Sequence, residues 1–411
     1  MPSAEAHRRN LLTVFQAALT RVNGRACVRN YLQAHPSAGA HYLIAVGKPA
    51  ANMAQGAADA LGEQIADGLV MTKHGHGETL PWPCLTSGHP FPDQASLDAG
   101  EALLRFIDRI PVRAQVLVLL SGGASALVER LPDGVTLEQL RAVNDWLLGA
   151  GLDINACNYV RKRISLIKGG RLAQLLAPRA VLSLIISDVP GNDAATVGSG
   201  PLVPDPRSGD TPALLSDTPA FVRKLLRQAP PIPRPEDPSF KSIESVIVAT
   251  LDDAKQAAAE TARERGYGVI VDGSFVSGDA VAIGTELAGQ LESAETGTFH
   301  VWGGETQVTL PSHPGRGGRC QSLALAAALA LRGQEGVLFL AAGTDGTDGP
   351  TDDAGAFVDG HTVERGAEQD LDAQQALERA DAGSFLEATG DLLRTGPTGT
   401  NVMDLMLGLK Y

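Results

Sequence analysis

The sequence lacks a long hydrophobic run and lacks paired cysteines. No stretch of the 411 residues approaches 18 uninterrupted apolar positions, so no membrane-spanning helix is expected. The four cysteines lie far apart and form no CxxC motif, which argues against a disulfide framework and against a zinc site. We therefore expect a soluble globular protein of the reducing cytoplasm.

Two common nucleotide-binding signatures are also missing. The one Gly-Lys pair, Gly47-Lys48, is followed by Pro49 and makes no Walker loop, and no GxGxxG follows a predicted strand. These absences argue against a P-loop NTPase and against a conventional NAD-dependent dehydrogenase. The net charge of −13 argues against nucleic-acid and membrane partners, so a small anionic substrate would need a local basic pocket.

The length of the chain predicts two domains, because 411 residues exceed what a single core usually serves. Five prolines in residues 229–238 predict a stiff, extended linker. We place the boundary there, with domains at 1–232 and 233–411. The spacing of Leu11, Phe15 and Leu19 predicts an amphipathic helix before the first domain's sheet.

Short apolar runs that end in glycine, serine or aspartate recur along the chain. Five apolar residues, Val116–Leu120, run without a polar break, as in a strand buried on both faces of a parallel sheet. Other strands are predicted at 42–46, 68–72, 181–186, 245–249, 268–271, 299–302, 307–310 and 337–341. Their alternation with helical segments predicts an α/β fold.

The turn after Val116–Leu120 is the first candidate binding site. The sequence from Ser121 to Ser125 suits a tight turn into a helix, whose free backbone N–H groups and dipole favour an anion. The alternative is a plain strand-to-helix turn whose glycines serve packing.

Lys48 and Asp188 follow two other predicted strands. Lys48 stands beside a helix that Pro49 begins, at the strand end where ligands bind in open α/β sheets. Asp188 follows the strand at 181–186, a common place for a Mg²⁺ ligand. A role for Asp188 as a helix or turn cap is the alternative.

A helix predicted over 155–176 would carry a cationic face. It places Arg161, Ser165 and Lys168 at i, i+4 and i+7, with no interleaved acid. We expect this face to contact an anion; the alternative is a solvated surface.

The second half of the chain has three polar loops of interest. The motif GRGGR at 315–319 precedes a predicted helix at 321–331, where guanidinium and backbone N–H groups suit a phosphate. The acidic loop at 343–353 does not match the EF-hand pattern; its carboxylates are candidates for Mg²⁺ or substrate hydroxyls, and some must form turns. The loop at 395–401 can donate N–H and O–H bonds.

The motifs taken together resemble the glycerate 2-kinase family, also called type II glycerate kinases or the MOFRL family. They are AVGK at 45–48, TKHGHG at 72–77, SGHPFPD at 87–93, LLSGGASAL at 119–127, NYVRKRISLIKGGRLA at 158–173, SDVPGND at 187–193, SGPLVPDP at 199–206, GGET at 303–306, GRGGR at 315–319, GTDGTDGPTDDAGA at 343–356 and TGPTGTNVMDL at 395–405. They occur in order over nearly the whole chain.

The resemblance implies a fold and a reaction. The first domain would be a doubly wound, Rossmann-like α/β domain and the second a smaller MOFRL-type α/β domain, with the active site in a cleft between them. The reaction would be ATP-dependent phosphorylation of the C2 hydroxyl of D-glycerate to 2-phosphoglycerate, with ATP and Mg²⁺ as cofactors. The family's catalytic lysine and arginine correspond to Lys48 and Arg319, which we expect to stabilise charge on the transferring phosphoryl group.

The carboxylate roles stay open at this point. Asp188 is the first candidate for the base toward the C2 hydroxyl or for a Mg²⁺ ligand, with Asp345 and Asp348 as competitors. The remaining candidate substrate- or phosphate-binding residues are Ser121, Gly122, Gly123, Ser125, Arg161, Lys168, Gly303, Gly304, Glu305, Thr306, Arg316, Gly317, Gly318, Thr398 and Asn401.

The chain departs from the family pattern at five positions. Ala124, Arg163, Cys320, Ser322 and Met403 stand where the family usually has glycine, histidine, asparagine, glutamate and asparagine. The last three lie in loops of the second domain and bear on fine contacts more than on the reaction class.

Two other functions are weighed against the kinase. An NAD(P)H-dependent hydroxypyruvate reductase is disfavoured by the missing GxGxxG. A non-catalytic sugar-acid or nucleotide-binding protein is disfavoured by the presence of Lys48, Arg319 and Asp188. Monomer and homodimer both remain open.

Overall fold

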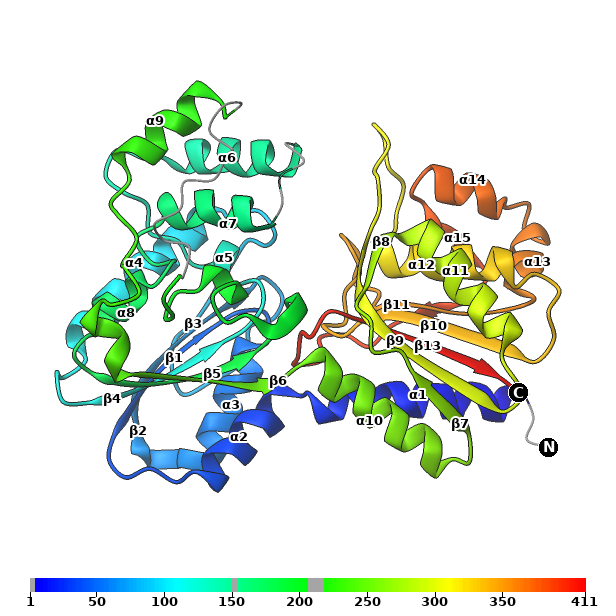
Figure 1. Cartoon of the computed structure of the whole chain (residues 1–411), viewed down its shortest axis with the longest axis horizontal. Helices are drawn as coiled ribbons and strands as arrows, with labels where there is room; N and C mark the ends of the chain where they lie inside the picture. Colours follow the sequence, from blue (N-terminus) through cyan, green and yellow to red (C-terminus); the bar gives the residue numbers. More distant parts are fainter. Residues whose placement is uncertain (1–3, 150–151, 153, 206–217) are drawn as a thin grey trace. The chain divides into compact units, whose positions relative to one another are not determined.

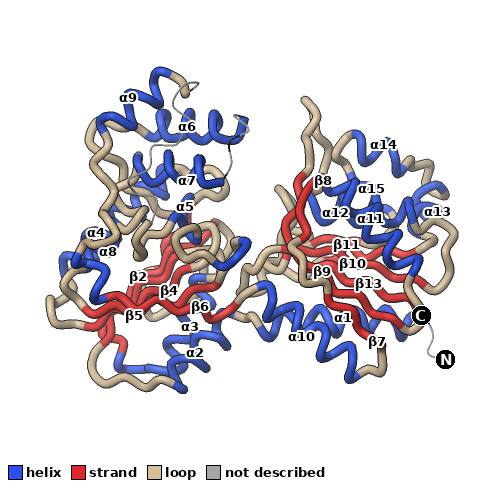
Figure 2. The backbone as a smooth tube through the Cα atoms, viewed as in Figure 1, coloured by secondary structure: helices blue, strands red, loops and turns tan. Residues whose placement is uncertain are grey.

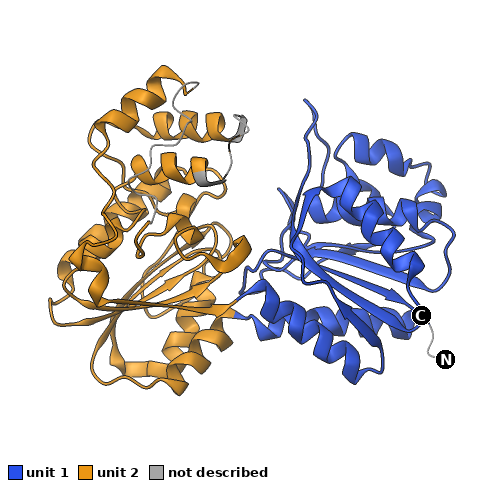
Figure 3. Cartoon of the chain, in the orientation of Figure 1, with its two compact units in different colours: residues 1–23, 250–411 blue, residues 24–249 orange. Residues whose placement is uncertain are grey.

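The computed structural model describes residues 4–149, 152, 154–205 and 218–411, which form two compact units. Residues 24–249 make one unit, here the inner unit, and residues 1–23 with 250–411 make the other, the outer unit (Figure 3). The last residue of the SGPLVPDP motif, Pro206, lies outside the described residues.

The division falls later than the predicted boundary after residue 232. The segment after the proline-rich stretch still belongs to the inner unit, because its strand β6 (Ile243–Ala249) pairs with β5 (Ala180–Ile186). The N-terminal helix α1 (Ala4–Arg21) belongs to the outer unit.

The inner unit is built on a parallel sheet of strand order β3-β2-β1-β4-β5-β6. Its remaining strands are β1 (His41–Val46), β2 (Ile65–Lys73), β3 (Cys84–Ser87) and β4 (Gln115–Leu120). This is the order of a doubly wound sheet, in which the direction of winding reverses between β1 and β4. The predicted Rossmann-like fold is confirmed.

Helices cover both faces of this sheet (Figures 1 and 2). The helices α2 (Gly24–Ala34) and α3 (Ala50–Leu61) lie on one face, and α4 (Gln94–Arg109) and α8 (Arg171–Leu176) on the other. The central strands are therefore apolar on both sides, which is why Val116–Leu120 is an uninterrupted apolar run. The other helical elements are α5 (Ala124–Leu127), α6 (Leu137–Gly149), α7 (Ile154–Arg163), α9 (Ala220–Gln228), η1 (Gly62–Gln64), η2 (Pro190–Asn192), η3 (Val197–Ser199) and η5 (Pro238–Ser242).

The predicted cationic helix face does not exist. Helix α7 ends at Arg163 and α8 begins at Arg171, with Gly169 and Gly170 at positive φ between them. Ser165 and Lys168 therefore lie outside any helix, and the spacing that placed them beside Arg161 does not apply.

Lys168 is instead half of a buried ion pair. Its ammonium group contacts the Glu129 carboxylate, and the two side chains are 6% and 1% exposed. The Ser165 hydroxyl donates to the other oxygen of Glu129 at 2.6 Å. The acid comes from 39 residues upstream, where spacing along a helix could not locate it. It gives Lys168 a buried structural partner, and a role of Lys168 in binding stays a prediction.

The outer unit contains a mixed sheet of order β12-β11-β10-β13-β9-β7, with β8 on the edge of β9. Its strands are β7 (Gly268–Val271), β8 (Val276–Asp279), β9 (Thr298–Gln307), β10 (Val337–Gly343), β11 (Gly355–Asp359), β12 (Leu392–Leu393) and β13 (Asp404–Lys410). Its helices, besides α1, are α10 (Leu251–Glu264), α11 (Ala280–Ser293), α12 (Arg319–Ala330), α13 (Thr362–Ala367), α14 (Ala373–Glu378) and α15 (Ala382–Ala388).

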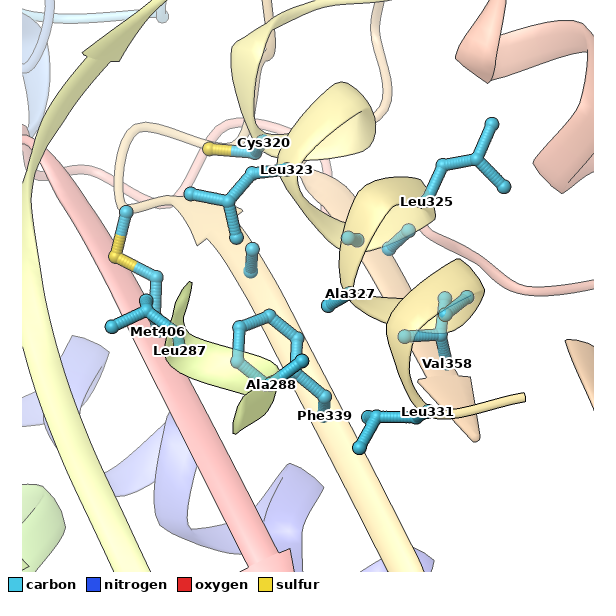
Figure 4. Close-up of a cluster of buried hydrophobic side chains, with 14 of the residues drawn as sticks. Leu287, Ala288, Cys320, Leu323, Leu325, Ala327, Leu331, Phe339, Val358 and Met406 are labelled. Atoms are coloured by element: carbon cyan, nitrogen blue, oxygen red, sulfur yellow. The ribbon is translucent and has the colours of Figure 1, made fainter. Parts of the chain in front are cut away.

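The core of the outer unit forms around α12, which is buried along most of its length. Leu323 of α12 and Leu331, just after the helix, pack with Phe339 of β10 and Met406 of β13 (Figure 4). Helix α1 packs on the other face of the sheet beside α10 (Figure 2). There the ring of His7 stacks on Tyr411 and bonds to the Tyr267 hydroxyl at 2.8 Å.

One strand prediction for the second half is wrong, because residues 308–310 are not in a strand. Four strands of this unit were not predicted, namely β8, β11, β12 and β13. Of these, β13 lies between β9 and β10 and pairs with both. The other predicted strands are confirmed, with ends that shift by a few residues. Among the described helices, none is long and apolar enough to cross a membrane.

The buried Glu129–Lys168 pair predicts a large and asymmetric effect on stability. Glu129→Gln leaves the Lys168 ammonium buried without its counter-charge, and the free energy of unfolding is expected to fall by about 3–5 kcal/mol. Adding Lys168→Met should restore a large part of the loss, because the double variant has no unpaired buried charge. Urea unfolding followed by circular dichroism measures both effects.

Glu101 provides the control, since it pairs with Arg130 in the same unit with both side chains more than one third exposed. Glu101→Gln should change the unfolding free energy by no more than about 1 kcal/mol. A Glu129→Gln loss as small as that of the control would contradict the structural role given to Lys168.

Candidate active site

The carboxyl edge of the inner sheet brings together three predicted residues. Lys48 follows β1, Ser121 follows β4 and Asp188 follows β5, and these strands are neighbours in the sheet. The register pairs Val46 with Leu120, so the β1 and β4 chain ends lie level. Because the winding reverses between β1 and β4, a crevice is expected above these ends, where open α/β sheets bind ligands.

A close approach of two backbones forms this edge. Gly47 has φ +133°, and a Cβ at this position would overlap with Ser121. The Lys48 amide donates to the Gly122 carbonyl at 2.9 Å, and the Thr72 hydroxyl donates to the Lys48 carbonyl at 2.9 Å. The backbone of Lys48 is thus fixed between β4 and the end of β2.

The side chain of Lys48 lies beside Gly123 and His89. A Cβ on Gly123 would stand 3.1 Å from Lys48 Cγ and 3.3 Å from His89 Nε2, so both side chains flank this turn. His89 was not among the predicted site residues. The signal that pointed to it is its place in the SGHPFPD motif.

The Ser121–Ser125 turn differs from the prediction in one respect. The helix that follows it, α5, is four residues long, so its dipole adds little to anion binding. The amide groups of Gly122 and Gly123 nevertheless donate no hydrogen bond within the described part of the chain. The Ser121 side chain is buried, with its hydroxyl 3.5 Å from the Val46 carbonyl.

Ser125 connects this turn to helix α7. Its hydroxyl lies 3.0 Å from that of Ser199, which in turn lies 3.5 Å from the Asn158 side-chain oxygen. Arg161 is one turn beyond Asn158 on α7, and residues three apart share a helix face. Arg161 is half-buried and makes no hydrogen bond or ion pair with the residues that the structure describes.

In the outer unit, Arg319 is the first residue of α12 and is held by two carboxylates. Its Nε and Nη2 donate to Asp404 at 2.6 and 2.9 Å, and its Nη1 lies 2.7 Å from Glu305. Asp404 is 1% exposed, whereas the Arg319 and Glu305 side chains are 35% and 42% exposed. Burial alone would lower the pKa of Arg319, but the charges of Asp404 and Glu305 outweigh it and raise that pKa.

Asp348 caps helix α12. Its two carboxylate oxygens accept hydrogen bonds from the amides of Cys320 and Gln321, at 3.1 and 2.8 Å. Burial raises the pKa of Asp348 to about 7, against the opposing effect of the Gln321 amide. Gly318 leaves the space for this carboxylate, which a Cβ there would overlap.

The loop residues around Asp345 are largely engaged in holding the loop itself. Asp345 accepts from the amide and the hydroxyl of Thr347 at 2.9 and 3.0 Å. The Thr398 hydroxyl donates to the Thr344 carbonyl, and Asn401 is buried. Turn formation was one of the expected roles of the acidic loop.

Arg316 and the GGET segment have partners that explain them without a ligand. Arg316 forms ion pairs with Asp353 and Glu387, a network that also includes Arg394. Gly303 and Gly304 lie within β9 and not in a loop, and a Cβ on them would meet Leu251 and overlap with Val276, respectively. Thr306 is buried in the same strand, and Gly317 extends beside the backbone of α15.

Asp404 is the main site residue that the sequence analysis missed. It is the next-to-last residue of the TGPTGTNVMDL motif and the first residue of β13, a strand that was not predicted. No group of three or more His, Cys, Asp or Glu side chains among the described residues has the arrangement of a metal site.

Two sequence families match the chain. Residues 10–220 match a family described as a domain of unknown function (DUF4147), and residues 298–404 match the MOFRL family.

Named relatives resemble the chain over most of its length. A D-glycerate 2-kinase of Thermotoga maritima is 36% identical over 89% of this chain and 90% of its own length. A putative hydroxypyruvate reductase of Agrobacterium vitis is 34% identical over 97% of this chain and 93% of its own. The crystal structure of a glycerate kinase from Thermotoga maritima superposes with a TM-score of 0.86 at 34% identity, covering 99% of this chain and all of that one. The chain therefore belongs to the glycerate 2-kinase family, as its motifs predicted.

Proposed function

We propose that this protein transfers the γ-phosphoryl group of ATP to the C2 hydroxyl of D-glycerate, giving 2-phosphoglycerate and ADP. The observation that carries the proposal is the position of Lys48 at the reversal point of a doubly wound sheet, in a chain that matches a D-glycerate 2-kinase along nearly its whole length. The first β–α turn of this sheet is Gly47-Lys48-Pro49 and not the glycine-rich turn of a dinucleotide-binding protein. The reductase function of the Agrobacterium relative's name is therefore disfavoured.

Phosphoryl transfer requires positioning and charge neutralisation more than covalent chemistry. Lys48 supplies a cation on a backbone fixed by Gly122 and Thr72. The free amides of Gly122 and Gly123 supply hydrogen bonds to an anionic oxygen beside it. Arg319 supplies a second cation, on a guanidinium whose plane Asp404 fixes.

Arg161 is the proposed partner of the glycerate carboxylate. It has no counter-ion among the described residues, and the Asn158–Ser199–Ser125 contacts link its helix face to the turn at Ser121–Ser125. Guanidinium groups bind carboxylates with two parallel hydrogen bonds, which would orient a small hydroxy acid.

The Mg²⁺ candidates differ in their fit. Asp348 does not fit, because both its oxygens accept helix amides and its raised pKa leaves it partly protonated near neutral pH. Asp188 fits better, since it is half-buried at a parallel-strand end, where a hard oxygen ligand can meet phosphate oxygens. Mg²⁺ held there would neutralise phosphate charge. We propose Asp188 as its ligand or as the base toward the C2 hydroxyl.

The direct test supplies the purified protein with ATP, Mg²⁺ and D-glycerate and couples the product to enolase, with and without phosphoglycerate mutase. Signal with enolase alone identifies 2-phosphoglycerate and is the expected result. Signal only after mutase is added would mean that the C3 hydroxyl is phosphorylated. If NADH oxidation with hydroxypyruvate is the only turnover found, the kinase proposal fails.

In the same assay, Lys48→Ala should lower kcat/KM by a factor on the order of 10²–10³, the usual loss for a group that stabilises transition-state charge. Lys241→Ala is the matched control. Lys241 is exposed and precedes β6 at the amino edge of the parallel sheet, opposite Lys48, so its removal should leave kcat/KM unchanged. Equal activity of the two variants would remove Lys48 from the mechanism.

Variants at Asp188 and Arg161 are expected to differ in whether they change kcat or KM. Asp188→Asn should abolish most turnover while ATP binding, followed by calorimetry, is retained. Arg161→Gln should raise the KM for D-glycerate by about 10- to 100-fold with a smaller effect on kcat, since it removes a charge-assisted hydrogen bond. Unchanged turnover in Asp188→Asn, or an unchanged KM in Arg161→Gln, would reject the respective role.

Asp348 should make stability depend on pH in a specific window. Its folded-state pKa of about 7 lies above the unfolded value of about 3.8, so its stabilising contribution is complete below about pH 4 and is lost as the pH rises to about 7. Asp348→Asn removes this loss. The unfolding free energy of the variant relative to the wild type should therefore rise with pH, by up to about 1.4 kcal/mol per unit.

Urea unfolding of both proteins from pH 5 to pH 8 measures this difference. Asp352→Asn, at an exposed neighbour in the same loop, is the control and should run parallel to the wild type. Parallel profiles for Asp348→Asn as well would show that Asp348 is ionised throughout the range.

A further inference from the structure

The two carboxylates on Arg319 hold it in different ways. Asp404 is almost fully buried and binds Nε and Nη2 together, as a parallel pair of hydrogen bonds. Glu305 contacts the remaining nitrogen, Nη1, and its side chain is 42% exposed. The Arg319 side chain is itself about one third exposed, so of its two carboxylate partners Glu305 is the one that shares its contact with solvent.

These two contacts also differ in strength. A buried, bidentate guanidinium–carboxylate pair is rigid, and breaking it leaves an uncompensated charge inside the protein. An ion pair between exposed side chains is worth about 0.2–1 kcal/mol and exchanges readily with solvent or another anion. Asp404 is therefore the fixed partner of Arg319, and Glu305 is the replaceable one.

We propose that Asp404 is a positioning residue that aims Nη1 of Arg319 at the reacting phosphate, and that Glu305 is an internal counter-ion which a phosphate group displaces from Nη1. The inference rests on the proposed function only in taking Arg319 as a phosphate-binding group. It replaces the expectation that Glu305 binds substrate, because a carboxylate beside a phosphate on one guanidinium nitrogen would repel it.

The displacement of Glu305 by phosphate has a simple consequence for the affinity of the protein for phosphate. Phosphate binding must overcome the Glu305–Arg319 contact, so removing the Glu305 charge should strengthen binding. Converting about 0.2–1 kcal/mol gives a Kd that is lower by a factor of about 1.4 to 5. Removing the Asp404 charge should instead weaken binding, by about tenfold or more, because Arg319 loses its fixed orientation.

The test measures the Kd of inorganic phosphate by isothermal titration calorimetry for the wild type, Glu305→Gln, Asp404→Asn, Arg319→Ala and the double variant Asp404→Asn/Arg319→Ala. The expected result is a lower Kd for Glu305→Gln and a higher Kd for Asp404→Asn. Asp404→Asn should have no further effect in the Arg319→Ala background, because a residue that acts only through Arg319 is coupled to it.

Arg365 offers a matched control in the same unit. It pairs with the buried Asp391 and with the partly exposed Asp359, both at 2.9 Å, so it too is held by one buried and one more exposed carboxylate, although only its Nη2 contacts Asp391. Asp391→Asn and Asp359→Asn each remove a carboxylate partner of Arg365, yet they should leave the Kd of phosphate unchanged. If the loss of any arginine–carboxylate pair changed the Kd of phosphate, the variants at Asp391 and Asp359 would change it as the variants at Asp404 and Glu305 do.

An unchanged or higher Kd for Glu305→Gln would contradict the proposal that phosphate displaces Glu305 from Arg319. The absence of phosphate binding in both the wild type and this variant would contradict it as well. An additive effect of Asp404→Asn in the Arg319→Ala background would overturn the positioning role. Since Glu305 is exposed, its variant tests the exchange even if Asp404→Asn fails to fold. Phosphate binding needs no turnover, so these results stand whichever acceptor the enzyme phosphorylates.

Discussion

The close approach of β1 and β4 at their carboxyl ends is the constraint on which the inner unit's site depends. Gly47 allows the β1 chain to pass Ser121 at a distance that no side chain would tolerate. The reversal of winding at this pair of strands then leaves room above their ends. Lys48 and the Gly122 and Gly123 amides converge on this point because β1 and β4 are adjacent and level. His89 reaches the same point from the segment that follows the edge strand β3.

Local patterns in the sequence were sufficient to predict much of this arrangement. The uninterrupted apolar run at Val116–Leu120 indicates a strand that is buried on both faces. Pro49 after Lys48 indicates the start of α3. Features that depend on distant partners could not be read in the same way. Lys168 was predicted to lie on an unpaired cationic helix face because its partner Glu129 is 39 residues away in the sequence. Asp404 was not predicted because its partner Arg319 is 85 residues away.

Burial separates structural cations from those available to a ligand. In a chain of net charge −13, many basic groups have a carboxylate close by. A basic pocket for an anionic substrate must therefore be formed by the basic groups that lack a buried carboxylate partner. Lys162 and Lys168 are buried against Asp205 and Glu129 and hold segments of the inner unit together. Arg161 lacks such a partner among the described residues, and Arg319 keeps one nitrogen on a replaceable partner. Sequence spacing alone treats these four cations alike.

Two departures, Cys320 and Met403, lie next to Arg319 and Asp404 in the sequence and are compatible with this division of roles. Burial raises the pKa of the Cys320 thiol, and the nearby Asp404 and Asp348 raise it further, so Cys320 adds no charge beside the Arg319–Asp404 pair. Met403 has φ +70°, a conformation that suits asparagine better than methionine and costs about 1 kcal/mol or more. The amide and the hydroxyl of Thr344 both donate to the Met403 carbonyl, at 2.9 and 2.6 Å. The backbone of this loop is therefore held without help from the side chain at 403, which explains how methionine replaces asparagine while Asp404 stays in register against Arg319.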